Sequence, residues 1–365
     1  DKYYHVILRS DSALLSLIDE LNLKDQLHWH ETKTGFLWKQ HFLTISNYRD
    51  FFTFPRLTLL EKGRLGLGLL YTTLSSAPKD QTAQAWLSSL FGSNIYHTFW
   101  EPLLTSKFGT LKEKIPATTL WSILRRYAST RSKRNGKELM GTLRPHGLKN
   151  LLQTLSRPLT IHCNAPVKKI LHRTVETPSQ TFTFDQIIST LPRDALSQLH
   201  PLPNIPSPTY LGVIRLALTL KSSLTPYYVT NLIDKTFSFT GIIDLTHIIH
   251  PEDRREQTLV MIPRYDIPSS PWFSLSDAEI TNTFLTELRT IFPSIDSQIL
   301  SSCVHREKRV QALWIDHPEP PPLPLHLSEN LWSVNNELIG QDSLNNNDVI
   351  ACANQAATHL VTALA

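Results

Sequence analysis

Glycine is scarce in this sequence, and the glycine pattern that opens most dinucleotide-binding folds is missing. Only 12 of the 365 residues are glycine, and none of them forms a G-x-G-x-x-G turn. Gly63, Gly66 and Gly68 lie close together, but they fall inside a stretch with helical spacing. Two explanations remain. Either the chain does not bind a dinucleotide, or the first βαβ unit of a dinucleotide-binding fold is missing from these residues.

Cysteines and long apolar runs are also few. The three cysteines, Cys163, Cys303 and Cys352, are odd in number and too far apart for a disulfide framework or a metal motif. No histidine–carboxylate metal motif stands out among the 15 histidines. No apolar run reaches the ~18 residues that a membrane span needs. We therefore predict reduced thiols in or near the core, no metal site, and a cytoplasmic location.

The charged residues are ordinary in number, and one cluster of basic residues stands out. A composition of 19% charged and 41% hydrophobic residues with a formal charge of +4 is typical of an ordinary globular protein. A length of 365 residues predicts two domains. The basic cluster at positions 125–137 reads as a solvated loop between domains, although a phosphate-bearing substrate or an anionic membrane surface is the alternative. No aromatic residues alternate with these cations, which argues against nucleic acid.

The stretch from Leu143 to Pro192 organises the rest of the chain. Gly147 opens a helix with an apolar stripe, and Pro158 ends that helix. Leu159 to Cys163 is a short β-rich run, and a further strand begins at Pro166-Val167. Gln186 to Thr190 has the pattern of a buried strand that ends before Pro192. Because ligands in open α/β sheets bind outside the carboxyl ends of strands, Thr190, Leu191 and Pro192 are candidate ligand-binding residues.

The remaining pattern predicts helices first and an antiparallel sheet later. Ser10-Asp11 should cap a helix from Ala13 to Leu21, and residues 27–43 should form a hairpin that turns at Gly35. A helix-like stretch from Tyr96 should break before Pro102. Later β-rich runs predict an antiparallel sheet, followed by a helix from Asp277 to Ile291.

Three stretches together resemble the amine-oxidase-like flavoproteins, the superfamily of protoporphyrinogen oxidases, carotenoid desaturases and UDP-galactopyranose mutases. The first stretch consists of Arg144-Pro-His-Gly147, Pro166-Val167 and Asp185-Gln-Ile-Ile-Ser-Thr-Leu-Pro192. The second is Trp100-Glu-Pro-Leu-Leu-Thr-Ser-Lys-Phe-Gly109. The third is the strand, loop and helix of residues 330–365. His146 and Asn345 stand where that family usually has glycine.

The resemblance implies an α/β fold: an FAD/NAD(P)-binding Rossmann-like domain, with its N-terminal βαβ missing, and an inserted α+β substrate domain. The implied segments are 1–8, the end of the first FAD segment; 9–138, the helical part of the substrate domain; 139–205, the middle FAD segment; 206–312, the substrate-domain sheet and helix; and 313–365, the last FAD segment. An empty first strand position would leave an exposed, aggregation-prone sheet edge.

The resemblance also implies two groups of site residues. The residues expected to bind FAD are Val167, Thr190, Leu191, Pro192, Asp342 and Asn347. The residues expected on the substrate side are Tyr4, His5, Trp100, Lys107, Asn231 and His247. Structural roles stay open for several of them. Trp100 suits a helix corner, Lys107 suits a helix C-terminus, Asn347 suits a helix cap, and a single histidine is more often structural.

The function that the resemblance implies is that of an FAD-dependent oxidoreductase, in which hydride passes from a small organic substrate to flavin. No catalytic side chain is assigned, because flavin chemistry needs few of them. The alternatives are a flavin-dependent isomerase of the nucleotide-sugar mutase type and a non-catalytic binding protein on the same fold. The substrate, apolar or glycosyl-linked, the oligomeric state and any peripheral membrane contact stay open.

Overall fold

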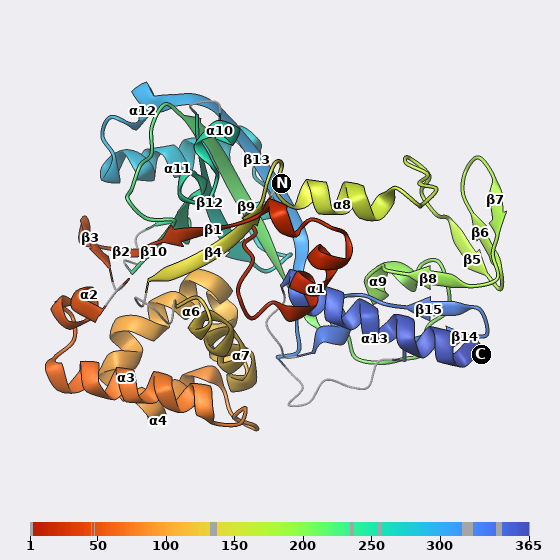
Figure 1. Cartoon of the computed structure of the whole chain (residues 1–365), viewed down its shortest axis with the longest axis horizontal. Helices are drawn as coiled ribbons and strands as arrows, with labels where there is room; N and C mark the ends of the chain where they lie inside the picture. Colours follow the sequence, from red (N-terminus) through yellow and green to blue (C-terminus); the bar gives the residue numbers. More distant parts are fainter. Residues whose placement is uncertain are drawn as a thin grey trace.

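The centre of the molecule is a mixed seven-stranded sheet. The computed structural model describes residues 3–44, 46, 48–131, 137–233, 237–254, 257–315, 324–340 and 345–364. In this part of the chain the sheet has the order β13-β9-β12-β11-β10-β2-β3, and all neighbours are antiparallel except β10 and β2 (Figure 1). Its strands are β2 (Thr34–Trp38), β3 (His41–Thr44), β9 (Thr209–Leu220), β10 (Val229–Leu232), β11 (Gly241–Asp244), β12 (Thr258–Asp266) and β13 (Ile299–Leu313).

One face of this sheet is covered by α11 (Asp277–Ile291), the helix expected from the sequence. Ser276 and Glu279 form a capping box at its start, which fixes the helix boundary locally. Ile280, Phe284 and Leu288 are fully buried against alternate residues of β9 and β12. Short elements flank this layer: η4 (Leu245–His247), α10 (Pro251–Arg254), η5 (Pro271–Ser274) and α12 (Ile295–Gln298).

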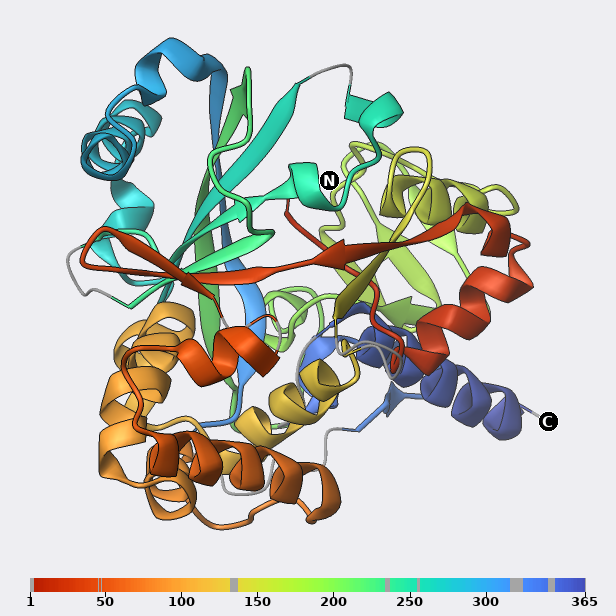
Figure 2. The same cartoon turned by 60° about the vertical axis from the view of Figure 1, so that its left-hand side comes forward.

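A helical layer covers the opposite face (Figure 2). It consists of α2 (Tyr48–Thr53), α3 (Leu59–Leu74), α4 (Ala83–Phe91), α5 (Ser93–Ile95), the π-helical η2 (Tyr96–Trp100), α6 (Glu101–Phe108), η3 (Gly109–Glu113) and α7 (Ala117–Ala128). The expected break before Pro102 is wrong. η2 passes directly into α6, because Pro102 lies in the first turn, where no backbone N–H is needed.

The expected turn at Gly35 is also wrong. Gly35 lies inside β2, and the turn between β2 and β3 is made by Lys39 and Gln40, both with positive φ. Glycine is needed at position 35 because of packing: an added Cβ would lie 2.4 Å from the Tyr227 ring. Only the tertiary contact between β2 and the residues before β10 distinguishes this glycine from a turn glycine.

Replacing Gly35 with alanine should lower the free energy of unfolding by about 1–3 kcal/mol, because the methyl group overpacks a filled site. The matched control is Gly66→Ala in α3, where an added Cβ meets no atom within 4 Å. That exchange should be neutral or stabilising by up to about 1 kcal/mol, since alanine favours helix. Urea denaturation of both variants measures the difference. Equal stabilities would contradict the packing explanation.

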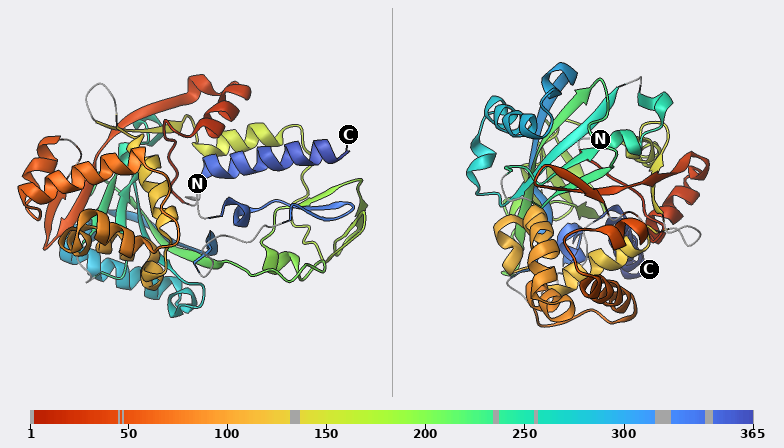
Figure 3. Two further views of the ribbon diagram at one scale, coloured as in Figure 1. Left: turned by 90° about the horizontal axis from the view of Figure 1, so that it is seen from below. Right: turned by 90° about the vertical axis from the view of Figure 1, so that its left-hand side faces the viewer.

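A smaller part of the molecule contains three further sheets. They are β14-β15-β8, β5-β6-β7 and the pair β1-β4 (Figure 3). The strands are β1 (Leu27–Thr32), β4 (Glu138–Leu143), β5 (Lys169–Leu171), β6 (Thr174–Glu176), β7 (Thr181–Thr183), β8 (Ile187–Ser189), β14 (His326–Ser328) and β15 (Leu331–Ser333). The helical elements are α1 (Ser12–Glu20), η1 (Lys24–Gln26), α8 (Leu148–Ser156), α9 (Arg193–Leu196), η6 (Asn336–Ile339) and α13 (Asn346–Leu364).

Helices α1, α8 and α13 share one apolar cluster, in which Leu14, Leu151 and Ile350 pack together. Within this cluster α1 packs directly against α13. His146, just before α8, has φ +72° and therefore adopts the left-handed backbone that a glycine would adopt without strain. The β-rich run 159–163 forms no strand, and its Leu159 and Ile161 are exposed.

Two other expectations from composition need correction. Cys163 and Cys303 are free but exposed, and Cys352 is half-buried, so the thiols are not core residues. Arg125 and Arg126 of the basic cluster lie on α7 and not in a loop; positions 132–136 fall outside the described residues. Among the described residues, no helix is both long and apolar enough to cross a membrane.

Candidate functional site

The carboxyl ends of β8 and β15 meet at one edge of the small sheet. The two strands are parallel, with Ser189 opposite Ser333, and the backbone N–H of Val334 donates to Ser189 O at 2.9 Å. Beyond the strands, Asn335 Nδ2 donates to Leu191 O at 2.9 Å. The expected corner 190–192 therefore lies beside the first residues after the last strand, the position where open α/β sheets bind ligands.

Glu337 is the functional candidate that the sequence reasoning missed. Its side chain is 1% exposed, and its Oε1 accepts a hydrogen bond from the backbone N–H of Arg193 at 3.0 Å and another from the Tyr210 hydroxyl. Burial and this carboxylate raise the pKa of Tyr210. The other oxygen, Oε2, is fully enclosed and has no hydrogen-bond partner. The only sequence signal was its position, four residues after β15 and inside the polar loop that begins at Asn335.

Of the other residues expected to bind FAD, Val167 packs on the apolar cluster of Ile187 and Leu331 beneath the strand ends. Thr190 is exposed, and Leu191 is 38% exposed. Pro192 immediately precedes α9. Asp342 lies outside the described residues. The structure thus brings Val167 and the corner 190–192 to the same edge as Glu337.

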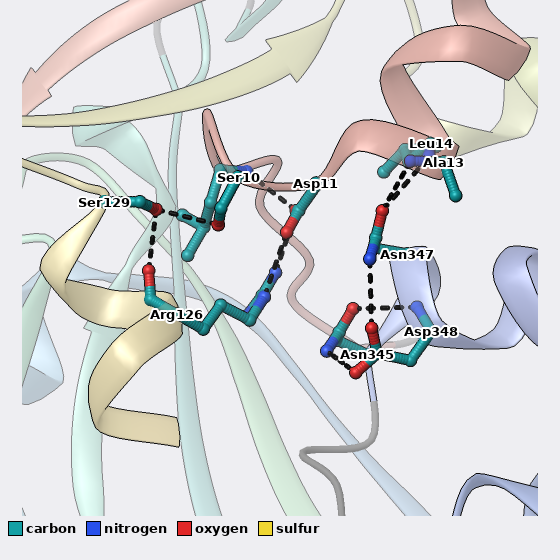
Figure 4. A network of polar contacts seen from close by, with 10 residues as sticks. Ser10, Asp11, Ala13, Leu14, Arg126, Ser129, Asn345, Asn347 and Asp348 are labelled. Carbon is teal, nitrogen blue, oxygen red and sulfur yellow. Dashed lines mark hydrogen bonds and ion pairs between the residues drawn. The ribbon is translucent and has the colours of Figure 1, made fainter. Parts of the chain in front are cut away.

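Asn347 connects the start of α13 to the start of α1 (Figure 4). Its Oδ1 accepts hydrogen bonds from Ala13 N at 2.8 Å and Leu14 N at 3.3 Å. The cap expected from Asp11 is absent, because Asp11 makes no side-chain bond to the first turn of α1. Asn345 caps the start of α13, because its Oδ1 accepts a hydrogen bond from Asp348 N at 3.1 Å.

Asn347→Ala should therefore destabilise the protein by about 0.5–2 kcal/mol through the loss of a cap on a different helix. The neighbouring exchange Asn346→Ala, on the same turn of α13, is the matched control and should change stability by less than ~0.5 kcal/mol. Thermal unfolding of both variants gives the comparison. Equal losses would show that the effect arises in α13 itself and not at the start of α1.

Asp11 is used in a different contact, a buried ion pair with α7. Arg126 donates to its two carboxylate oxygens, with distances of 3.0 Å from Nε and 2.9 Å from Nη2 (Figure 4). Leu8 N also donates to Oδ2 of Asp11 at 2.8 Å. Asp11 is 1% exposed, so this pair fixes the N-terminal segment against the helical layer.

Tyrosines gather where the N-terminal segment meets the face of the large sheet that carries the helical layer. Tyr4, Tyr228 and Tyr265 form this group, the tyrosine wall, and the hydroxyls of Tyr4 and Tyr265 are 2.6 Å apart. Burial, with neighbouring phenols adding to it, raises the pKa of Tyr4 and Tyr228 well above the ordinary value. At neutral pH these side chains are therefore neutral hydrogen-bond donors in an apolar wall.

Lys107 and Trp100 belong to the helical layer. Burial, with Arg126 nearby, lowers the pKa of the Lys107 ammonium to about 8. Trp100 is 5% exposed and packs against Phe91 and Phe99 in the core of that layer, as the structural alternative requires. Its Nε1 is enclosed and has no hydrogen-bond partner.

The three remaining substrate-side candidates are spread over the molecule. His5 is exposed beside Tyr4. Asn231 lies in β10 and donates weakly to Gly35 O at 3.5 Å. His247 lies 2.8 Å, through Nε2, from the carbonyl of Thr225, so it supports the loop before β10. Of the six candidates, Tyr4 is the one that belongs to the tyrosine wall.

A model of the flavin-containing amine oxidoreductases matches residues 1–310, so the chain belongs to this family. The resemblance found in the sequence is confirmed. The enzyme class is that of the FAD-dependent oxidoreductases, with FAD as cofactor. No curated protein sequence matches the chain.

Solved structures agree on the fold. A candidate protoporphyrinogen oxidase from Exiguobacterium sp. 255-15 is 13% identical, with a TM-score of 0.70 over 99% of this chain and 87% of that one. A cyclohexylamine oxidase from Brevibacterium oxydans IH-35A is 13% identical, with a TM-score of 0.62 over 100% and 88%. A reduced UDP-galactopyranose mutase is 11% identical, with a TM-score of 0.61 over 85% and 71%. The expected α/β fold with a Rossmann-like domain is confirmed.

Proposed function

We propose that this protein transfers a hydride from a small organic substrate to FAD, with the cofactor held at the carboxyl ends of β8 and β15. The observation that carries the proposal is the unpaired, buried Oε2 of Glu337 at that edge. An enclosed carboxylate oxygen without a donor is costly unless a ligand supplies one. A hydroxyl of the FAD ribityl chain would be such a donor once the side chains that enclose Oε2 move aside, so the chemistry of this acceptor fits the cofactor.

In this proposal one group of residues contacts the cofactor and another lines the substrate side. Glu337 would accept a hydroxyl hydrogen of the cofactor, while the corner 190–192 and Asn335 would shape the backbone around it. The tyrosine wall of Tyr4, Tyr228 and Tyr265 would exclude water and supply neutral hydroxyl donors on the substrate side. FAD, when bound, supplies the two-electron acceptor.

The division of the chain is part of the same proposal. Segments 1–8, 139–205 and 313–365 would bind the cofactor, and segments 9–138 and 206–312 would bind the substrate. The strand pairing supports most of this division, because β8 pairs with β15 while β2 and β3 join the sheet of β9 to β13. The start of the second segment departs from it, since α1 packs with α8 and α13 and β1 pairs with β4. Limited proteolysis with and without FAD should protect the first group of segments selectively.

The isomerase alternative has less support. Such an enzyme needs several free arginines around a nucleotide sugar. Arg264 is already engaged by Asp266 Oδ2 at 2.7 Å and by Ser238 O, which leaves Arg215, whose Nε has no partner, as a single cation. No observation in the described residues favours the non-catalytic alternative over the enzyme, and the spectrum described next separates the two.

The decisive test is the visible absorption spectrum of the protein expressed from its complete gene and passed through gel filtration. Flavin bands that travel with the protein, and that bleach anaerobically with a substrate, support the proposal. A colourless protein that also fails to bind added FAD overturns it and leaves a binding role. Flavin that is retained but transfers no net electrons to any acceptor supports the isomerase instead.

A further inference from the structure

Arg215 is a buried cation for which the described residues provide no anionic partner. Its side chain is 3% exposed, its Nε is enclosed without a hydrogen-bond partner, and its guanidinium Cζ lies 5.7 Å from the centre of the Tyr3 ring. Burial lowers the pKa of Arg215, but a guanidinium keeps its charge inside proteins. A buried charge without a partner is strongly destabilising, so a site that keeps one has a reason other than stability.

Six other arginines of the chain have carboxylate partners. Arginines that are more exposed than Arg215 form ion pairs with aspartate or glutamate, as follows: Arg126, Arg144, Arg264, Arg289, Arg306 and Arg309. Arg193, which is also buried, donates to the carbonyl of Pro203 at 2.9 Å. Arg215 is thus the most buried of the described arginines, and the described residues give it no acceptor.

The position of Arg215 places it on the substrate side of the large sheet. Its neighbours on β9, Ile214 and Leu216, pack toward α11, so the alternation of the strand turns Arg215 to the face with the helical layer. Tyr3, next to Tyr4 of the tyrosine wall, covers the guanidinium. Tyr210, which contacts Glu337 at the candidate cofactor site, lies five residues earlier on the same strand, roughly 17 Å away at ~3.3 Å per residue, and the same alternation turns it to the α11 face.

We propose that Arg215 binds a carboxylate of the substrate, which makes the substrate an organic acid with an apolar or aromatic body; this rests on the proposed function. The planar fork of a guanidinium matches a carboxylate bidentately. One carboxylate neutralises one guanidinium, whereas a doubly charged phosphate would leave a buried negative charge. A free ammonium, the reacting group of simple amines, is repelled from this position.

The test uses calorimetric titration of the protein from its complete gene with four probes: benzoate, benzamide, benzylamine and inorganic phosphate. Benzoate should bind about 10- to 100-fold tighter than the neutral benzamide, as expected for charge-assisted hydrogen bonds. Arg215→Met should bring benzoate to the level of benzamide. The matched control Arg289→Met, which breaks an exposed pair with Asp296, should leave the preference intact.

A second measurement keeps the test valid if one variant behaves unexpectedly. Arg215→Met should unfold at the same or a higher urea concentration than the wild type, because it removes an unpaired buried charge. A strongly destabilised variant that still prefers benzoate would mean a structural role and overturn the proposal. Equal or tighter binding of benzylamine or phosphate would also overturn it. Flavin retained in the spectrum together with no carboxylate preference would defeat this inference while leaving the proposed function standing.

Discussion

Glu337→Ala should lower the free energy of unfolding by about 2–5 kcal/mol. The exchange removes the acceptor of two hydrogen bonds, from the Arg193 backbone and the Tyr210 hydroxyl, in a place that is 1% exposed. Each buried donor left without an acceptor costs ~1–3 kcal/mol. Urea denaturation with a two-state fit measures the loss.

Glu337→Gln separates stability from cofactor binding. Its amide oxygen can still accept both hydrogen bonds, so the variant should lose less than ~1.5 kcal/mol, while its amide nitrogen cannot accept from a cofactor hydroxyl at the position of Oε2. FAD affinity, measured by flavin fluorescence, should therefore fall about tenfold or more. Unchanged FAD affinity in the glutamine variant would contradict a role for Glu337 at the cofactor and leave it a purely structural acid.

Arg126→Leu should destabilise the protein by about 3–5 kcal/mol, because it leaves the Asp11 carboxylate buried and unpaired. The side chains of this pair are 17% and 2% exposed, so solvent cannot compensate. The effect should be seen as earlier thermal unfolding. It should be accompanied by loosening of the N-terminal segment, which hydrogen exchange at Leu8 would report, since that amide donates to Asp11.

A double-mutant cycle shows whether the pair itself is responsible. Combining Asp11→Leu with Arg126→Leu should be less damaging than the sum of the single exchanges, with a coupling above ~1 kcal/mol. The matched control is the exposed pair Arg289–Asp296, with side chains 44% and 57% exposed, where the coupling should stay below ~1 kcal/mol. Additive losses at Asp11 and Arg126 would contradict a specific ion pair.

Local sequence signals predicted elements well where the deciding contacts are close along the chain. Ser276 and Glu279 fix the start of α11 within one turn, so the helix expected from Asp277 to Ile291 is found with those bounds. Gly92, with φ +92°, likewise ends α4 locally. The strand that ends before Pro192 was predicted for the same reason. Each of these features depends on residues no more than about five apart, so the pattern in the sequence already contains the interaction.

Polar side chains were predicted less well, because the sequence does not say which distant group they meet. Asp11 looked like a cap but pairs with Arg126, which is 115 residues away, and Asn347 caps a helix that starts more than 300 residues earlier. Gly35 looked like a turn and is a packing residue under Tyr227. In each case the residue type suits both roles, and only the packing of separate segments selects one.

The sequence by itself determined the family, the α/β class and the corner at residues 190–192, because these rest on ordered motifs and on the periodicity of apolar residues. The tertiary structure alone decided that Glu337 has an unpaired carboxylate oxygen beside that corner, and that Arg215 is buried without an anionic partner among the described residues. The physical reason is that burial and the presence or absence of a partner are properties of the assembled layers. Whether a charged residue is buried, and whether it has a partner, is set only when the N-terminal segment, the sheet and the last strand have packed against one another.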